Sequence, residues 1–84
     1  MIYRNRSRYR SKLTIMLKIL SIARVPVRRS YILTRANLNS SRLASYLDTL
    51  IADGLIEPIE SPFKGYLITS KGLELLAKYE SITD

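Results

Sequence analysis

The sequence predicts an α+β fold in which three helices are followed by a β-hairpin and an additional C-terminal helix. Three observations support this. Apolar residues recur at helical spacing in four segments, two short segments with strand character flank a turn-rich one, and residues that favour helix ends separate these elements. A chain of 84 residues fits one small domain. We assign residues 1–10 to a flexible basic N-terminal arm and residues 11–84 to the folded domain.

The first helix is expected from residue 12 to about residue 24, with Ser11 as its N-cap and Pro26 beyond its end. Its apolar residues form two adjacent stripes. The stripe expected to face the core consists of Leu13, Met16, Leu17, Leu20 and Ala23. The second stripe consists of Ile15, Ile19 and Ile22. A helix that is apolar over more than half of its circumference needs two packing partners, and one of them could be another subunit.

The second helix is expected over residues 31–36, with Ser30 as its N-cap. It would bury Ile32, Leu33 and Ala36. Asn37 suits the left-handed conformation that often ends a helix.

The third helix is expected to begin at Asn39 or Ser40 and to end at Ala52 or Asp53, with Gly54 as its C-cap. Its apolar face consists of Leu43, Leu47, Leu50 and Ile51. Because only about three residues separate it from the preceding helix, the pair is a candidate helix-turn-helix.

Residues 55–60 and 65–69 are expected to form a β-hairpin, with Tyr66 and Ile68 on one face. The intervening Ser-Pro-Phe-Lys-Gly has the composition of a turn. The order of helices and hairpin is that of a winged helix-turn-helix domain.

The last helix is expected from residue 71 to about residue 82, with Ser70 as its N-cap. It also has two apolar faces. One consists of Leu73, Leu76 and Ala77, and the other of Leu75, Tyr79 and Ile82. We expect the second face of this helix and the second stripe of the first helix to form a homodimer interface. The residues predicted to lie in it are Ile15, Ile19, Ile22, Leu75, Tyr79 and Ile82.

Charge is distributed unevenly along the chain. The first 42 residues contain eleven Lys and Arg and no Asp or Glu, whereas the rest contains three Lys and seven Asp or Glu. This asymmetry favours a polyanionic partner, most simply a nucleic-acid backbone. Alternate positions of the arm hold Arg4, Arg6, Arg8 and Arg10, whose side chains would share one side of an extended chain. The arm could be a disordered tail, or it could become ordered on a phosphate backbone or in a minor groove.

The composition argues against several other classes of protein. The chain has no Cys and no His, which excludes disulfides and thiolate metal sites and removes the usual general base. Its carboxylates are scattered over separate elements, so we expect no enzymatic activity, no metal and no cofactor, and no small-molecule ligand is evident. No apolar stretch approaches the roughly 20 residues that span a bilayer. No signal peptide is recognisable, so we expect a cytoplasmic protein, in the host cytoplasm if it is viral.

Several segments resemble one known family. They are YILTRANL at residues 31–38, RLASYL at residues 42–47, LIADGLIE at residues 50–57 and YLITSKGL at residues 66–73. Over about residues 11 to 82 the chain is similar to the archaeal winged-helix transcription regulators that are common in crenarchaea and their viruses. The resemblance implies a DNA-binding homodimer joined through its terminal helices. Its third helices would enter successive major grooves, and its hairpin wings would contact flanking DNA.

The third helix provides the candidate base contacts. If its leucines point inward, the outward-facing residues and the leading turn provide Ser40, Ser41, Arg42, Ser45 and Thr49. Arg42 could donate two hydrogen bonds to guanine, worth roughly 1 to 3 kcal/mol of discrimination between bases. Arg42 could also contact phosphate or have no role in DNA binding. Because serines bind bases and phosphates equally well, we expect few base contacts.

Other candidates lie outside the leading turn of this helix. The predicted phosphate contacts are Arg28, Arg29, Arg35 and Tyr46. Tyr46 could instead pack in the core, and the arginines could form a solvated basic surface. At the wing the candidates are Phe63 and Lys64. Phe63 could enter a minor groove or fold back onto the core.

These features together predict a homodimeric regulator of transcription that binds double-stranded DNA. One alternative is a sequence-tolerant architectural protein similar to chromatin proteins, for which the arginine arm and weak base readout would be sufficient. Another is a winged-helix module that binds other proteins, although the concentrated positive charge argues against it.

Overall fold

The computed structural model describes residues 11–83, with side chains for residues 11–80. In chain order the elements are α2 (Lys12–Ile22), α3 (Arg29–Ala36), α4 (Ser40–Ala52), β1 (Ile56–Ile59), β2 (Gly65–Ile68) and α5 (Ser70–Thr83). The expected order of helices and hairpin is confirmed, and the fold is a winged helix. The predicted arm at residues 1–10 lies outside the described residues.

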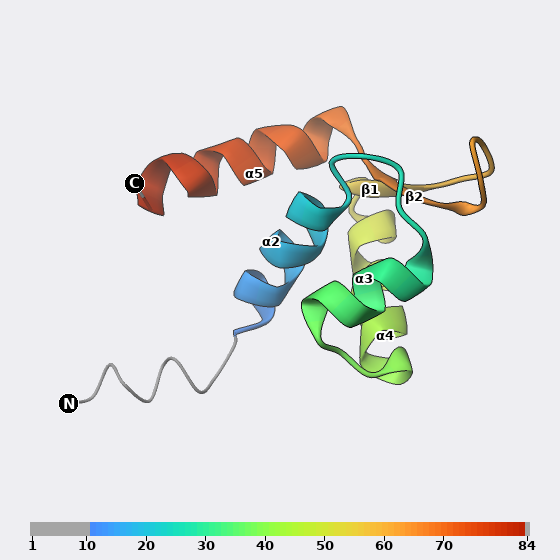
Figure 1. The fold of residues 1–84 in the computed structure, drawn as a ribbon. Coiled ribbons are helices and arrows are strands. Elements are labelled where there is room, and N and C mark those ends of the chain that lie inside the picture. The colour runs from blue at the N-terminus through green and yellow to red at the C-terminus, as the bar shows by residue number, and fades with distance from the viewer. Residues whose placement is uncertain (1–10, 84) are drawn as a thin grey trace.

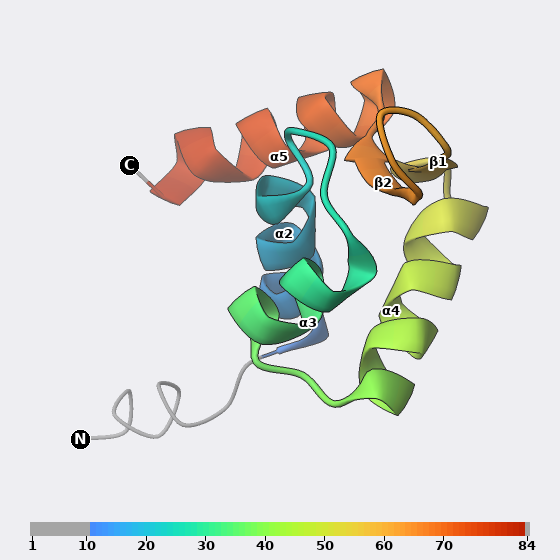
Figure 2. The ribbon, with the colours of Figure 1, turned by 45° about the vertical axis from the view of Figure 1, so that its right-hand side comes forward.

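The helices α2, α3 and α4 surround a common core, and the hairpin and α5 cover one end of it. Figure 1 shows the hairpin projecting beyond α4, and Figures 1 and 2 both show α5 crossing the C-terminal end of α2. The C-terminal part of α5 extends past α2. Among residues 11–83, no helix has the length and apolar character needed to cross a membrane.

Side-chain caps fix the starts of α2 and α4. The Oγ atom of Ser11 accepts a hydrogen bond from the N–H of Thr14 at 3.1 Å. The Oδ1 atom of Asn39 accepts one from the N–H of Arg42 at 2.8 Å. Both caps were expected, and so was the left-handed conformation of Asn37 (φ 56°, ψ 54°) after α3.

The start of α3 differs from the expected one. The helix begins at Arg29, so Ser30 lies in its first turn and is not its N-cap. The reason is that Val27 pairs with the hairpin, which leaves Arg28 in an extended conformation (φ −82°, ψ 156°) immediately before the helix. The side chain of Arg28, the N-cap residue of α3, makes no capping hydrogen bond.

The expected orientation of α2 is only partly confirmed. Leu20 and Ala23 are buried as expected, but most of the second stripe is buried as well. Ile15 and Ile19 are fully buried in the core, whereas Leu13 is 42% exposed. Because both α3 and α5 pack against α2, the domain itself covers the second apolar stripe. Met16 and Leu17, which were expected to face the core, are only partly buried.

The leucine face of α4 is confirmed. Leu43, Leu47 and Leu50 are buried, whereas Ile51 lies at the edge of this face and is 36% exposed. Gly54, with a φ of 74°, follows the helix in the left-handed region. The face is predictable because α4 packs on the core from one side only.

The start and orientation of α5 also differ from expectation. The Oγ1 atom of Thr69, not Ser70, accepts the capping hydrogen bond from the N–H of Gly72 at 3.0 Å. A Cβ atom at Gly72 would lie 2.2 Å from the carbonyl oxygen of Leu55, so the helix and this backbone are in direct contact. This close contact between Gly72 and the Leu55 carbonyl determines which side of α5 faces the core. Of the expected core face only Leu76 is buried, while Leu73 and Ala77 are exposed.

The hairpin is antiparallel and is joined to the α2–α3 connection. Ile56 pairs with Ile68, and Ile68 and Tyr66 both pack on the core, as expected. The N–H of Val27 donates to the carbonyl of Tyr66 at 3.1 Å, and the N–H of Tyr66 donates to the carbonyl of Val27 at 2.8 Å. Gly65 permits this pairing, because a Cβ atom there would lie 2.2 Å from the carbonyl oxygen of Val27.

Replacing Gly65 by alanine tests this close approach. The added methyl group forces the backbone of Val27 away, so we expect Gly65→Ala to lower the free energy of unfolding by about 2 to 3 kcal/mol. Gly54→Asn is the matched control, because Asn tolerates a positive φ and its Cβ atom would meet only the Lys71 side chain at 4.0 Å. Urea unfolding of both variants measures the difference. Equal stability of Gly65→Ala and the wild type would show that the hairpin is not held against Val27.

Candidate nucleic-acid interface

The N-terminal half of α4 presents an exposed polar surface. Ser40, Ser41, Arg42, Ser45 and Thr49 are all exposed on this helix. There is no acidic residue in its first turn, and its N-terminal N–H groups carry the positive end of the helix dipole. The predicted base-contact residues are therefore all accessible, while their contact with DNA stays a prediction.

Arg29 connects the start of α3 to the start of α4. Its Nη1 donates a hydrogen bond to the Ser40 Oγ at 3.2 Å, and its Nη2 donates one to the Ser40 carbonyl oxygen at 3.0 Å. The guanidinium group is held beside the N-terminus of α4 and adds positive charge there. A consequence is that the Ser40 hydroxyl already has a partner within the protein.

Arg42 lies on the other side of α4, in a depression shared with α2. Together with Arg42, this depression is lined by Lys12, Met16, Ser45, Tyr46 and Thr49. Tyr46 is partly buried and packs against the core, which agrees with the core-packing alternative. Lys12 was not among the predicted site residues. Its position depends on how α2 packs beside α4, and no local sequence signal reports this packing.

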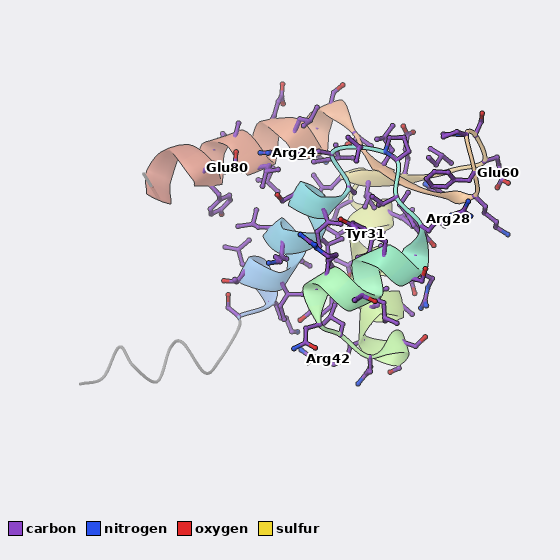
Figure 3. The ribbon with its side chains drawn as sticks, viewed as in Figure 1. Arg24, Arg28, Tyr31, Arg42, Glu60 and Glu80 are labelled. Carbon is purple, nitrogen blue, oxygen red and sulfur yellow. The ribbon has the colours of Figure 1, made fainter. Side chains whose placement is uncertain are left out.

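The hairpin wing places Phe63 against Arg28. The Cζ atom of Arg28 lies 4.3 Å from the centre of the Phe63 ring, and Phe63 is partly buried. Phe63 therefore lies against Arg28 and is not packed on the core cluster, so folding back onto the core is not confirmed, and entry into a minor groove stays untested. Lys64 is exposed and lines a depression with Arg29, but Glu60 lies in the same depression and offsets part of the positive charge. Figure 3 shows Glu60 on the hairpin and Arg28 on the same side of the domain.

The remaining predicted phosphate contact is separate from the start of α4. The Cζ atom of Arg35 lies 5.5 Å from the centre of the Tyr31 ring, on the outer face of α3. Arg28 lines the same depression as Arg35. The three predicted arginine contacts are thus divided between two surfaces, with Arg29 alone at the start of α4, while Tyr46 lies in the depression between α2 and α4.

Another arginine of the basic half faces α5. The Nη2 atom of Arg24 lies 2.6 Å from Oε2 of Glu80. Figure 3 shows Arg24 just beyond the end of α2 and Glu80 on α5. Both side chains are about half exposed, so this ion pair contributes at most about 1 kcal/mol to stability. It joins α5 to α2 and removes Arg24 from the basic surface.

The predicted dimer interface needs correction at α2. Ile15 and Ile19 are buried within the domain and cannot contact a second subunit. Ile22 and Leu75 are partly buried against the core, whereas Tyr79 is partly exposed and does not pack on the core cluster. The side chain of Ile82 lies outside the described residues.

No group of three potential metal-ligating side chains occurs in the described part of the chain. The exposed groups at the start of α4 are hydroxyls, guanidinium groups and free backbone N–H groups. All of these donate hydrogen bonds, and the surface is suited to an anionic ligand.

Comparisons with known proteins agree with this architecture. A family model described as winged helix-turn-helix matches residues 9–84. The chain is also similar to the crystal structure of Sso10a-2, a DNA-binding protein from Sulfolobus solfataricus, with a TM-score of 0.77 and 28% sequence identity. The match covers 88% of this chain and 79% of that one. A search among curated proteins gave no match. The resemblance to crenarchaeal winged-helix proteins is thus confirmed, and the chain belongs to the winged helix-turn-helix family.

Proposed function

We propose that the protein binds double-stranded DNA through the N-terminal half of α4 and acts as a homodimeric regulator of transcription. The observation that carries this proposal is the arrangement around the first turn of α4. Exposed hydroxyls and Arg42 lie there without any acidic residue, and two hydrogen bonds hold Arg29 beside them. A helix N-terminus of this kind can enter a major groove while neighbouring cations contact phosphates.

Two further features support binding to a duplex. Lys12 lines the same depression as Arg42, and the arginine-rich segment ends two residues before Lys12 in the sequence. On the opposite side of α4, Arg29 donates its two hydrogen bonds to Ser40. Cations therefore flank α4 on both sides. The similar protein from Sulfolobus solfataricus is also described as DNA-binding.

Regulation would follow from occupancy of a site near a promoter. A dimer would place two copies of α4 in successive major grooves, with half-sites about 34 to 36 Å apart. Binding would then block or recruit the polymerase. The intracellular concentration of the protein would set the response.

A sequence-tolerant architectural role is the second candidate, and one contact favours it. The Ser40 hydroxyl is bonded to Arg29, which leaves Arg42 as the principal side chain able to distinguish bases. A protein with a single strong base reader and several phosphate contacts would bind many sequences with similar affinity. The ratio of affinities for a selected site and for random duplex separates the two roles, with roughly a thousand or more expected for a regulator.

Substitutions at Arg42 test its proposed role as base reader. Arg42→Lys keeps the charge but loses the two parallel N–H groups that can bind guanine. We therefore expect the ratio of affinities for the selected site and for random duplex to fall about 5-fold or more. The affinity for random duplex should stay near that of the wild type. Arg42→Ala should lose the same preference and also reduce the salt slope by about one unit. Fluorescence anisotropy with selected and random duplexes at several salt concentrations measures both quantities. Full preference in Arg42→Lys would assign Arg42 to phosphate binding instead.

The proposed dimer is tested on α5. We place the interface on the face that carries Leu75, Tyr79 and Ile82, because α5 extends past α2 and Tyr79 is not packed on the core. We expect Tyr79→Asp to convert a dimer into a monomer in sedimentation equilibrium at micromolar concentration, because the interface would bury an unpaired carboxylate. Leu13→Asp, on the exposed side of α2, is the control and should remain dimeric. A dimeric Tyr79→Asp protein would contradict this interface.

A further inference from the structure

The outer face of α3 has an open depression that is separate from the start of α4. Its volume is about 650 Å³, and its walls come from residues 25–28, from the exposed side of α3 and from Phe63 of the hairpin. Two arginines line it and no Asp or Glu does. In Figure 3, Tyr31 and Arg28 lie on this side of α3, whereas Arg42 lies near the start of α4.

Two arginine–aromatic pairs border the depression. Arg28 lies over Phe63 and Arg35 lies over Tyr31, at 4.3 Å and 5.5 Å from the ring centres. A guanidinium group stacked on a ring keeps its other face and its edge N–H groups available to a ligand. Arg28 and Arg35 take no part in the ion pair between Arg24 and Glu80, which is the one ion pair found among the described residues.

Apart from the hydroxyls of Ser30 and Thr34, the rest of the depression is apolar, and much of it is exposed. Val25 is 61% exposed and Tyr31 is 48% exposed, and Pro26 lies beside Val25. Apolar walls, an exposed ring and stacked guanidinium groups suit a flat π-system that carries negative charge. Unpaired nucleobases bind proteins in this way, by stacking on aromatic rings and on guanidinium planes.

A nucleic acid fits this surface better than an acidic peptide. The chain has a net charge of +7, and Arg28 in the depression is followed directly by Arg29, whose guanidinium group reaches the start of α4. One polyanion could therefore contact both surfaces. A carboxylate side chain would pair with the arginines, but it would leave the stacking surface of Tyr31 unused.

We propose that this depression binds an unpaired nucleotide of a single-stranded nucleic acid. The base stacks on Tyr31 beside Val25, and Arg28 and Arg35 bind the adjacent phosphates. The site goes beyond duplex binding, because every base of an intact duplex is paired and stacked. The protein would then bind single strands, and also duplexes that border an open segment.

Binding of the full-length protein to a fluorescent thymidine 12-mer tests the proposal. We expect Tyr31→Ala to weaken 12-mer binding about fivefold or more, with duplex binding within about twofold of the wild type, because one stacked base is lost. Tyr31→Phe keeps the ring and should bind like the wild type. An abasic 12-mer of equal charge should bind the wild type at least about fivefold more weakly than the thymidine 12-mer.

Several results would overturn the proposal. They are unchanged 12-mer affinity in Tyr31→Ala, parallel loss of 12-mer and duplex affinity, or equal affinity for the abasic strand. Free thymidine monophosphate that binds as tightly as the 12-mer would assign the site to a free nucleotide. Tighter binding of an acidic, phenylalanine-containing 12-residue peptide would assign it to a protein partner.

A measurement on the wild type covers the case in which Tyr31→Ala does not fold. In a nuclear magnetic resonance titration with the thymidine 12-mer, the backbone amides of Val25, Arg28 and Tyr31 should shift more than those of Ser41 and Arg42. The reverse order would place the single strand on α4 and contradict the proposal.

Discussion

The backbone pairing between Val27 and Tyr66 fixes the geometry on which the candidate interface depends. It is possible because Gly65 has no side chain to obstruct the carbonyl oxygen of Val27. The pairing holds the α2–α3 connection against the hairpin and keeps Arg28 extended, so that α3 begins at Arg29. The first side chain of α3 then reaches Ser40 at the start of α4. One close backbone contact thus aligns the wing and both helices of the helix-turn-helix.

Within the described part of the basic half, residues 11–42, the arginines do not form one continuous cationic surface. Arg29 and Arg42 lie on the two sides of α4, whereas Arg28 and Arg35 stack on aromatic rings at the outer face of α3. Arg24 forms an ion pair with α5. This division is consistent with two proposed modes of contact, in which the groove-facing helix binds a duplex and the stacked arginines bind an unpaired strand. Because the arginines are divided in this way, the net charge of the chain overestimates how many cations lie around α4.

The predictable parts of the fold are those that local interactions determine. The caps at Ser11 and Asn39, the left-handed Asn37 and the leucine face of α4 all follow from short-range patterns. The orientations of α2 and α5 do not, because each has apolar residues on two sides and tertiary packing selects which side is buried. The exposed candidates on α4 were predictable from its periodicity. The bond from Arg29 to Ser40 and the position of Lys12 required the folded arrangement of separate helices.

The central claim is that a duplex meets the protein at the first turn of α4. The most direct measurement is a nuclear magnetic resonance titration of the full-length protein with a double-stranded oligonucleotide at physiological salt. We expect the largest changes at the backbone amides of Ser40, Ser41 and Arg42 and at the side-chain Nε–H of Arg29. Changes confined to α5, with these four signals unmoved at saturation, would contradict the account.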